Sequence, residues 1–151
     1  MAFSARGTRD LEGRVMATGE SSLLQQLSAL VRLVREIGTA RDQEAIHGPS
    51  LSALHALCRV DRSSILLLDQ RGVARFVAWR RLSDAYRAAV EGHFPWRLDD
   101  RDPKAILISD VELEPSMAAF REVFAKEGIR AVGFVPLVYR ERLVGKFMLY
   151  F

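Results

Sequence analysis

Two apolar runs at the end of the chain constrain its fold more than any other feature. Residues 129–139 read IRAVGFVPLVY and residues 143–151 read LVGKFMLYF, and both runs are rich in β-branched and aromatic side chains. Only Arg140, Glu141 and Arg142 separate them. Runs of this composition joined by a short polar turn are typical of two antiparallel strands in a hairpin. We therefore expect this hairpin at the centre of a sheet.

Helices and strands are expected to alternate through the rest of the chain. Pro49 follows Gly48 and is expected to break one helix and open the next, because proline fits the first turn of a helix better than its interior. Ser83 and Pro115 are expected to start helices, and Gly128 to end one. In chain order, we expect helices over residues 21–38, 42–47 and 49–59, strands over 63–69 and 73–80, a helix over 83–92, a loop over 93–103, a strand over 106–108 and a helix over 115–127.

An apolar seam marks the helix expected over residues 21–38. Its members are spaced four, three, four and three residues apart: Leu23, Leu27, Leu30, Val34 and Ile37. This spacing is typical of a coiled coil or a helix bundle, so we predict that this helix, from Leu23 to Ile37, joins two copies of the chain in a homodimer. An amphipathic helix that lies on its own sheet is the alternative. Residues 1–20 lack such periodicity and are expected to form a mobile tail.

Composition limits the class of protein. With 151 residues, 49% of them hydrophobic, the chain is long enough for one well-buried core. Its 22 basic residues are nearly balanced by 19 acidic ones, and the arginines are scattered, so we expect no direct nucleic-acid partner. No apolar run approaches the roughly 20 residues that cross a bilayer, and no secretory signal is apparent. We therefore expect no membrane insertion and a cytoplasmic location.

Several segments together resemble the GAF family of small-molecule sensor domains. They are the hairpin at the end of the chain, RSSILLLDQRGVARFVAW at residues 62–79, and ISDVELEP at residues 108–115. More narrowly, EGHFPW at residues 91–96 and GKFMLYF at residues 145–151 look like GAF domains at the front of bacterial sensor histidine kinases.

The resemblance implies an α+β fold with α/β/α layers, formed by a single GAF-like sensory domain over residues 21–151. A central, mainly antiparallel sheet of five to six strands would carry helices on one face. A pocket covered by a loop and helices would lie on the other face. GAF domains usually continue through a helix into the next domain, whereas this chain ends at its last strand. We therefore expect the linking helix and the output domain to be missing from this chain.

The alternation of side chains along the last strand predicts which residues face the pocket. One set, which includes Phe147 and Leu149, is purely apolar and is expected to meet the helical layer. The other set contains Lys146 and is expected to face the pocket. His93 and Trp96 in the covering loop offer a titratable group and an aromatic wall. The predicted ligand-binding residues are Ser64, Leu66, Trp79, His93, Trp96, Val132, Phe134, Lys146, Met148 and Tyr150.

Lys146 is the one charged residue inside the last strand. Burial of an unpaired ammonium costs several kcal/mol, so an anionic partner is expected nearby. The partner could be an acidic ligand or a carboxylate such as that of Asp110. Extension of the ammonium to solvent is a further alternative. The sequence identifies neither a cofactor nor a metal ion.

The resemblance also implies a function. A non-catalytic sensory domain would bind a small molecule, mediate dimerisation, or do both, and control an output domain such as that of a two-component sensor histidine kinase. A purely structural dimerisation module is the alternative. A GAF-type methionine sulfoxide reductase is a further one, but it needs a nucleophilic and a resolving thiol, whereas the chain has only Cys58. We expect Cys58 to face the core as an unreactive apolar residue.

Overall fold

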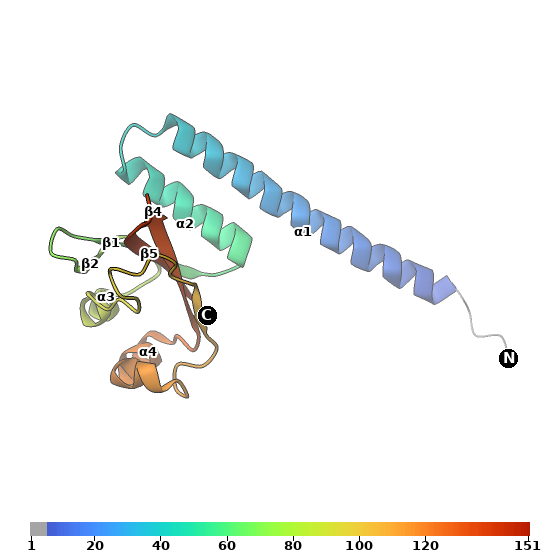
Figure 1. Ribbon diagram of the computed structural model, residues 1–151. Helices are drawn as coiled ribbons and strands as arrows, with labels where there is room; N and C mark the ends of the chain where they lie inside the picture. The colour runs from blue at the N-terminus through green and yellow to red at the C-terminus, as the bar shows by residue number, and fades with distance from the viewer. Residues whose placement is uncertain (1–5) are drawn as a thin grey trace.

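The computed structural model describes the backbone of residues 6–151 and the side chains from residue 22 onward. The elements in chain order are α1 (Arg6–Thr39), α2 (Glu44–Cys58), β1 (Arg62–Leu68), β2 (Ala74–Arg80), α3 (Asp84–Val90), β3 (Ile106–Ile108), the 3-10 helix η1 (Pro115–Phe120), α4 (Arg121–Glu127), β4 (Val132–Tyr139) and β5 (Arg142–Tyr150). Their order and type follow the prediction, apart from differences in α1 and α2. Figure 1 shows that α1 extends far beyond the rest of the domain.

The five strands form one antiparallel sheet in the order β2-β1-β5-β4-β3. β5 pairs with β1 on one side and with β4 on the other, so the closing hairpin lies inside the sheet as predicted. β3 is a three-residue edge strand beside β4, and β2 forms the other edge. The prediction of a mainly antiparallel sheet of five to six strands is confirmed.

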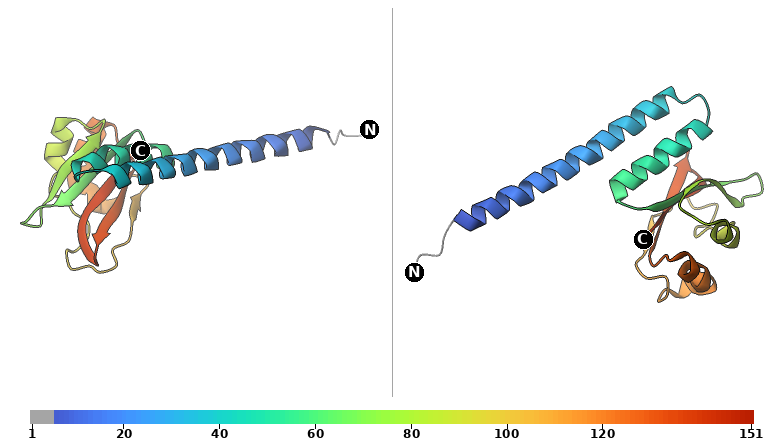
Figure 2. Two further views of the ribbon diagram at one scale, coloured as in Figure 1. Left: turned by 90° about the horizontal axis from the view of Figure 1, so that it is seen from above. Right: turned by 180° about the vertical axis from the view of Figure 1, so that it is seen from behind.

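Helices cover both faces of the sheet, as Figures 1 and 2 show. α2 packs on β1 and β2, and α1 packs on α2. α3, η1 and α4 lie on the other face, where a cluster of buried apolar side chains joins them to the sheet. Tyr86 of α3, Met117 of η1 and Phe124 of α4 meet Leu66 and Phe134 of the sheet in this cluster. The predicted α/β/α layering is confirmed.

α1 begins earlier than predicted. It starts at Arg6 rather than at residue 21, so residues 6–20 are helical and do not form an irregular tail. Residues 1–5 of the predicted tail lie outside the described residues. No proline precedes Pro49, and a helix once nucleated gains one hydrogen bond for each residue added. No helix in the described part of the chain has the length and apolar character to span a membrane.

α2 continues through Pro49, so the predicted break at this residue is wrong. Proline removes the backbone hydrogen bond to the carbonyl four residues earlier, which is that of Ala45. This loss falls in the first half of the helix, and burial of Leu51 and Ala53 holds α2 in its layer. Tertiary packing therefore offsets the local cost of the proline.

Cys58 is exposed, so the prediction that it faces the core is wrong. It is the last residue of α2, and the chain turns away immediately after it, because Arg59 adopts a left-handed conformation with φ of 54°. The next buried side chain is that of Val60, which is 2% exposed. The helical spacing from Leu51 and Leu54 indicated the core, but Cys58 is the last residue of α2, and its side chain stays exposed where the chain turns away.

Candidate functional site

Seven of the predicted site residues lie on one buried face of the sheet. They are Ser64, Leu66, Val132, Phe134, Lys146, Met148 and Tyr150, and none is more than 2% exposed. In the register of the strands, Leu66 lies opposite Lys146, and Ser64 opposite Met148. Side chains that pair directly across antiparallel strands point to the same side, so alternation along β5 predicted this face correctly.

Lys146 is fully buried at the centre of this face. Its Nζ donates a hydrogen bond to the carbonyl oxygen of His93, with an N···O distance of 2.5 Å. The ammonium also lies 5.1 Å from the ring centroid of Phe134 and 5.7 Å from that of Phe94. Burial lowers the pKa of Lys146 to about 7.

Two of the explanations offered for Lys146 are wrong. The predicted salt bridge to Asp110 does not form, because the Asp110 carboxylate accepts hydrogen bonds from the guanidinium of Arg130, at 3.2 Å, and from the backbone N–H of Glu112, at 3.0 Å. The ammonium does not extend to solvent either, since Lys146 is 0% exposed. Among the described residues, no carboxylate forms an ion pair with Lys146.

Residues 93–105 lie between α3 and β3, and the first of them covers Lys146; we call this segment the lid. The His93 ring at its start packs on Phe120 of η1 and Phe134 of β4, with centroid distances of 5.0 and 5.7 Å. Burial, together with the positive charge of Lys146, lowers the pKa of His93 to about 4. The ring is therefore neutral at pH 7.

Trp96 lies further along the lid and is partly buried against the core cluster. Its ring packs edge to face on Phe94, with a centroid distance of 5.5 Å. Its Nε1–H donates a hydrogen bond to the carbonyl oxygen of Lys104, at 2.8 Å, within the lid itself. The structure thus brings His93 and Trp96 into the lid as predicted, with His93 nearer to Lys146.

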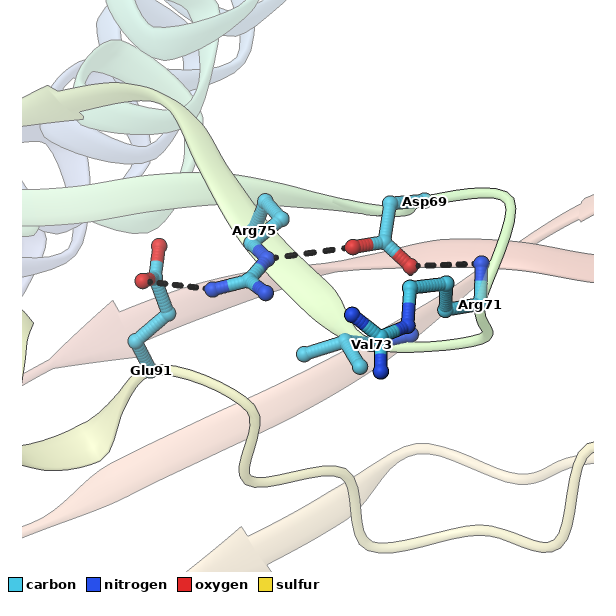
Figure 3. A network of polar contacts seen from close by, with 5 residues as sticks. All are labelled: Asp69, Arg71, Val73, Arg75 and Glu91. Atoms are coloured by element: carbon cyan, nitrogen blue, oxygen red, sulfur yellow. Dashed lines mark hydrogen bonds and ion pairs between the residues drawn. The ribbon is translucent and has the colours of Figure 1, made fainter.

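A polar network fixes the point at which the lid begins (Figure 3). The Asp69 carboxylate accepts hydrogen bonds from the backbone N–H groups of Arg71 and Val73, and from the side chain of Arg75. The Val73 hydrogen bond contributes most to lowering the pKa of Asp69. Arg75 also donates to Glu91 at the end of α3, with a distance of 3.0 Å. The turn between β1 and β2 therefore holds the end of α3, two residues before His93.

A second polar cluster lies on the same face. The Tyr150 hydroxyl is 2.9 Å from Ser64 Oγ and donates to Met148 Sδ at 3.4 Å. The Tyr86 ring packs edge to face on Tyr150, and the buried Tyr86 hydroxyl has no hydrogen-bond partner among the described residues. Burial raises the pKa of both tyrosines. Tyr86 was not among the predicted site residues, although its position three residues after the N-cap Ser83 and four before Val90 could have indicated an inward-facing residue.

Trp79 lies at the exposed edge of the same sheet face and is not buried with the other site residues. It pairs with Ser64 at the edge of the sheet, is 43% exposed, and carries the guanidinium of Arg87 at 3.7 Å from its ring centroid. A β-bulge between Ile65 and Leu66 shifts the register of β1 and β2, so alternation alone could not assign a face to Trp79.

An open groove of about 1170 Å³ lies at the end of the sheet, where the turns of the two hairpins meet the lid. Its walls include Asp69, Leu98, Tyr139 and Arg142. None of the predicted site residues lines it. In the described part of the chain, no group of three or more potential metal-ligating side chains comes together.

Comparison with known proteins gave both a family match and a relative of known structure. The family model described as GAF domain matches residues 42–151. A domain of a protein described as a two-component sensor histidine kinase, from Sinorhizobium meliloti 1021, is 40% identical to this chain. The alignment covers 74% of this chain and 74% of that chain, with a TM-score of 0.66.

Other solved structures share the fold at lower identity. The GAF domain of a phosphoenolpyruvate-protein phosphotransferase from Coxiella burnetii is 16% identical, with a TM-score of 0.63 over 84% of this chain and 77% of that chain. The blue-light absorbing form of the PixJ GAF domain from Thermosynechococcus elongatus is 18% identical, with a TM-score of 0.57 over 73% of this chain and 69% of that chain. A comparison with curated proteins gave no match.

Proposed function

Because the chain belongs to the GAF domain family, we propose that it is a non-catalytic regulatory domain that pairs with a second copy through α1. A small molecule held between β5 and the lid is the signal, and the predicted site residues on this face contact it. The domain controls an output domain of the kind found in two-component sensor histidine kinases, and it acts in the cytoplasm.

The observation that carries this proposal is the apolar stripe that α1 leaves exposed. We call it the α1 seam, and its residues are between 42% and 64% exposed: Leu23, Leu24, Leu27, Leu30, Val31, Val34 and Ile37. α1 packs on α2 through a different stripe, which includes Ala29 and Leu33. Contact with its own domain therefore does not account for the seam, and an exposed apolar stripe of this length favours association with another helix.

The relative from Sinorhizobium meliloti supports the type of output domain. It is 40% identical over about three quarters of both chains, and its protein is described as a two-component sensor histidine kinase. An α1 helix that projects away from the domain suits such a protein, because paired helices can connect a sensory domain to a neighbouring domain.

The two alternatives fit the geometry less well. A structural dimerisation module would explain the α1 seam. It would not explain a fully buried Lys146, because burial of this ammonium lowers the stability of the fold. The reductase alternative depends on thiols, and Cys58 is the chain's one cysteine. It lies at the end of α2, on the sheet face opposite the lid, so it is not placed to serve the buried site.

Native mass spectrometry and an absorption spectrum of freshly purified protein test the proposed function together. We expect the mass of a dimer with a small molecule bound to each copy. A dimer without a bound mass or a visible absorption band would favour the structural module. A monomer at micromolar concentration would contradict the proposal.

A further inference from the structure

The ammonium of Lys146 has more hydrogen-bonding capacity than its surroundings use. It carries three N–H donors, and the described residues provide one acceptor, the carbonyl oxygen of His93. No carboxylate of the described residues pairs with it, and burial lowers the pKa of Lys146. An anion that reached this position would gain a charged hydrogen bond and would compensate a charge that the fold already buries.

The groups around Lys146 are flat and largely apolar. The rings of Phe134 and Phe94 lie within 6 Å of the ammonium, and Phe120 lies behind the His93 ring. Because the His93 ring is neutral at pH 7, it adds no positive charge that would strengthen binding of a small hydrated anion such as phosphate. Aromatic walls around a single cation favour a ligand with a planar body and one negative group.

We propose that this site binds a small planar carboxylate. Its carboxylate oxygens accept hydrogen bonds from Lys146 in place of the His93 carbonyl, and its ring lies among the aromatic side chains of the lid. Binding moves the first residues of the lid away from β5, while the network from Asp69 to Glu91 keeps the end of α3 in place. This inference rests on the proposed sensory function and names the class of ligand for the same site.

Binding of a carboxylate at Lys146 depends on the protonation state of the Lys146 amine. His93 faces Lys146 from the lid, whereas β1 and β4 place Leu66 and Pro136 beside it, neither of which titrates. The pKa of Lys146 is about 7, so the ammonium form that an anion requires becomes scarce above neutral pH. Affinity should therefore fall as pH rises, by about tenfold for each pH unit well above this pKa.

Calorimetric titration of the intact protein with sodium benzoate tests the proposal. Benzamide serves as the neutral isostere, and inorganic phosphate as an anion without a ring. We expect benzoate to bind at pH 6.5, to bind about tenfold or more weakly at pH 8.5, and to outcompete both control compounds. The pH dependence is measured on the wild-type protein and needs no variant.

Matched substitutions test whether benzoate binds at Lys146. Lys146→Met should abolish benzoate binding, whereas Lys126→Met, at an exposed lysine of α4, should leave it unchanged. Circular dichroism confirms that each variant is folded. If Lys146→Met does not fold, the pH dependence of benzoate affinity in the wild-type protein still tests the proposal.

Four results would overturn the inference. They are the absence of benzoate binding in the millimolar range, equal binding of benzamide, tighter binding of phosphate, or the same affinity at both pH values. Because dimerisation and co-purified ligand are measured separately, a dimer that carries a ligand of another class would remove this inference and leave the proposed function standing.

Discussion

Lys146 should lower the stability of the unliganded domain, since a buried ammonium without a counter-charge favours the unfolded state. Lys146→Met should raise the free energy of unfolding at pH 6 by about 1–3 kcal/mol, the cost of an imperfectly satisfied buried polar group. The pKa of Lys146 is about 7 in the folded state, against an ordinary value of 10.5. Between these values the unfolded state binds more protons, so wild-type stability rises with pH and the advantage of the variant shrinks.

Urea denaturation at pH 6, 7, 8 and 9 measures this effect, with Lys126→Met as the control. A Lys146→Met protein that is less stable than wild type at pH 6 would show that a counter-charge compensates the ammonium.

Cys58 should react readily in the native protein, because its side chain is exposed at the end of α2. Its reaction with a chromogenic disulfide reagent at pH 8 should proceed within about tenfold of the rate in denaturant. Cys58→Ser should abolish the signal. Protection of the thiol until the protein unfolds would show that the end of α2 is packed more tightly than the structure indicates.

Individual residues were predictable where a single strand fixed their direction. Alternation along β5 identified Lys146, Met148 and Tyr150, because the side-chain period of a strand is two. The partner of Lys146 was not predictable, since contact with the His93 carbonyl depends on the path of the lid. Cys58 was assigned wrongly because helical periodicity shows which residues share a face but not how far neighbouring elements cover that face.

Gly145 permits the close approach of β5 to β1. A Cβ at this position would lie 2.2 Å from the carbonyl oxygen of Leu66, which is backbone and cannot rotate away. Gly145→Ala should therefore cost about 3 kcal/mol. Gly133→Ala is the matched control on β4, because the atom nearest to its Cβ would belong to the exposed side chain of Leu107, at 3.0 Å, and the Leu149 side chain would lie at an ordinary contact distance of 3.7 Å.

Urea denaturation of the two glycine variants measures the difference. Equal loss of stability in both would contradict the close approach at Gly145.

The turn between β4 and β5 stores backbone strain. Arg140 and Glu141 both have positive φ, 48° and 59°, which is the conformation of a type I′ turn and favours glycine or asparagine. Glu141→Gly should stabilise the domain by about 1 kcal/mol. Glu141→Ala retains the Cβ and should give no such gain, so equal melting temperatures for the two variants would contradict this assignment.

Elements were predictable where local signals define their ends. Ser83 accepts a hydrogen bond from the Tyr86 N–H as the N-cap of α3, and Gly128 ends α4 with φ of 70°. Both caps follow from residue type alone. The continuity of α2 through Pro49 was not predictable, because packing around the helix decides it. The start of α1 at Arg6 has no local cap signal in the sequence.

At the scale of the whole molecule, the sheet separates the lid from α1. Lys146 lies on β5 under the lid, β5 pairs with β1, and α2 connects β1 to α1. The elements β5, β1 and α2 therefore lie between the lid and the α1 seam. The strand order β2-β1-β5-β4-β3 was not predicted, since periodicity within a strand does not identify its neighbours.

We propose that the α1 seam joins two copies of this GAF domain, and the oligomeric state of seam variants tests this directly. The control variant combines Gln25→Glu and Ser28→Glu, at exposed positions of α1 outside the seam. Sedimentation equilibrium over the micromolar range should give a dimer for the wild type and for this control. Leu27→Glu combined with Val34→Glu should give a folded monomer, because charges in the seam oppose helix pairing. A monomeric wild type, or a dimer that survives both seam substitutions, would contradict the claim.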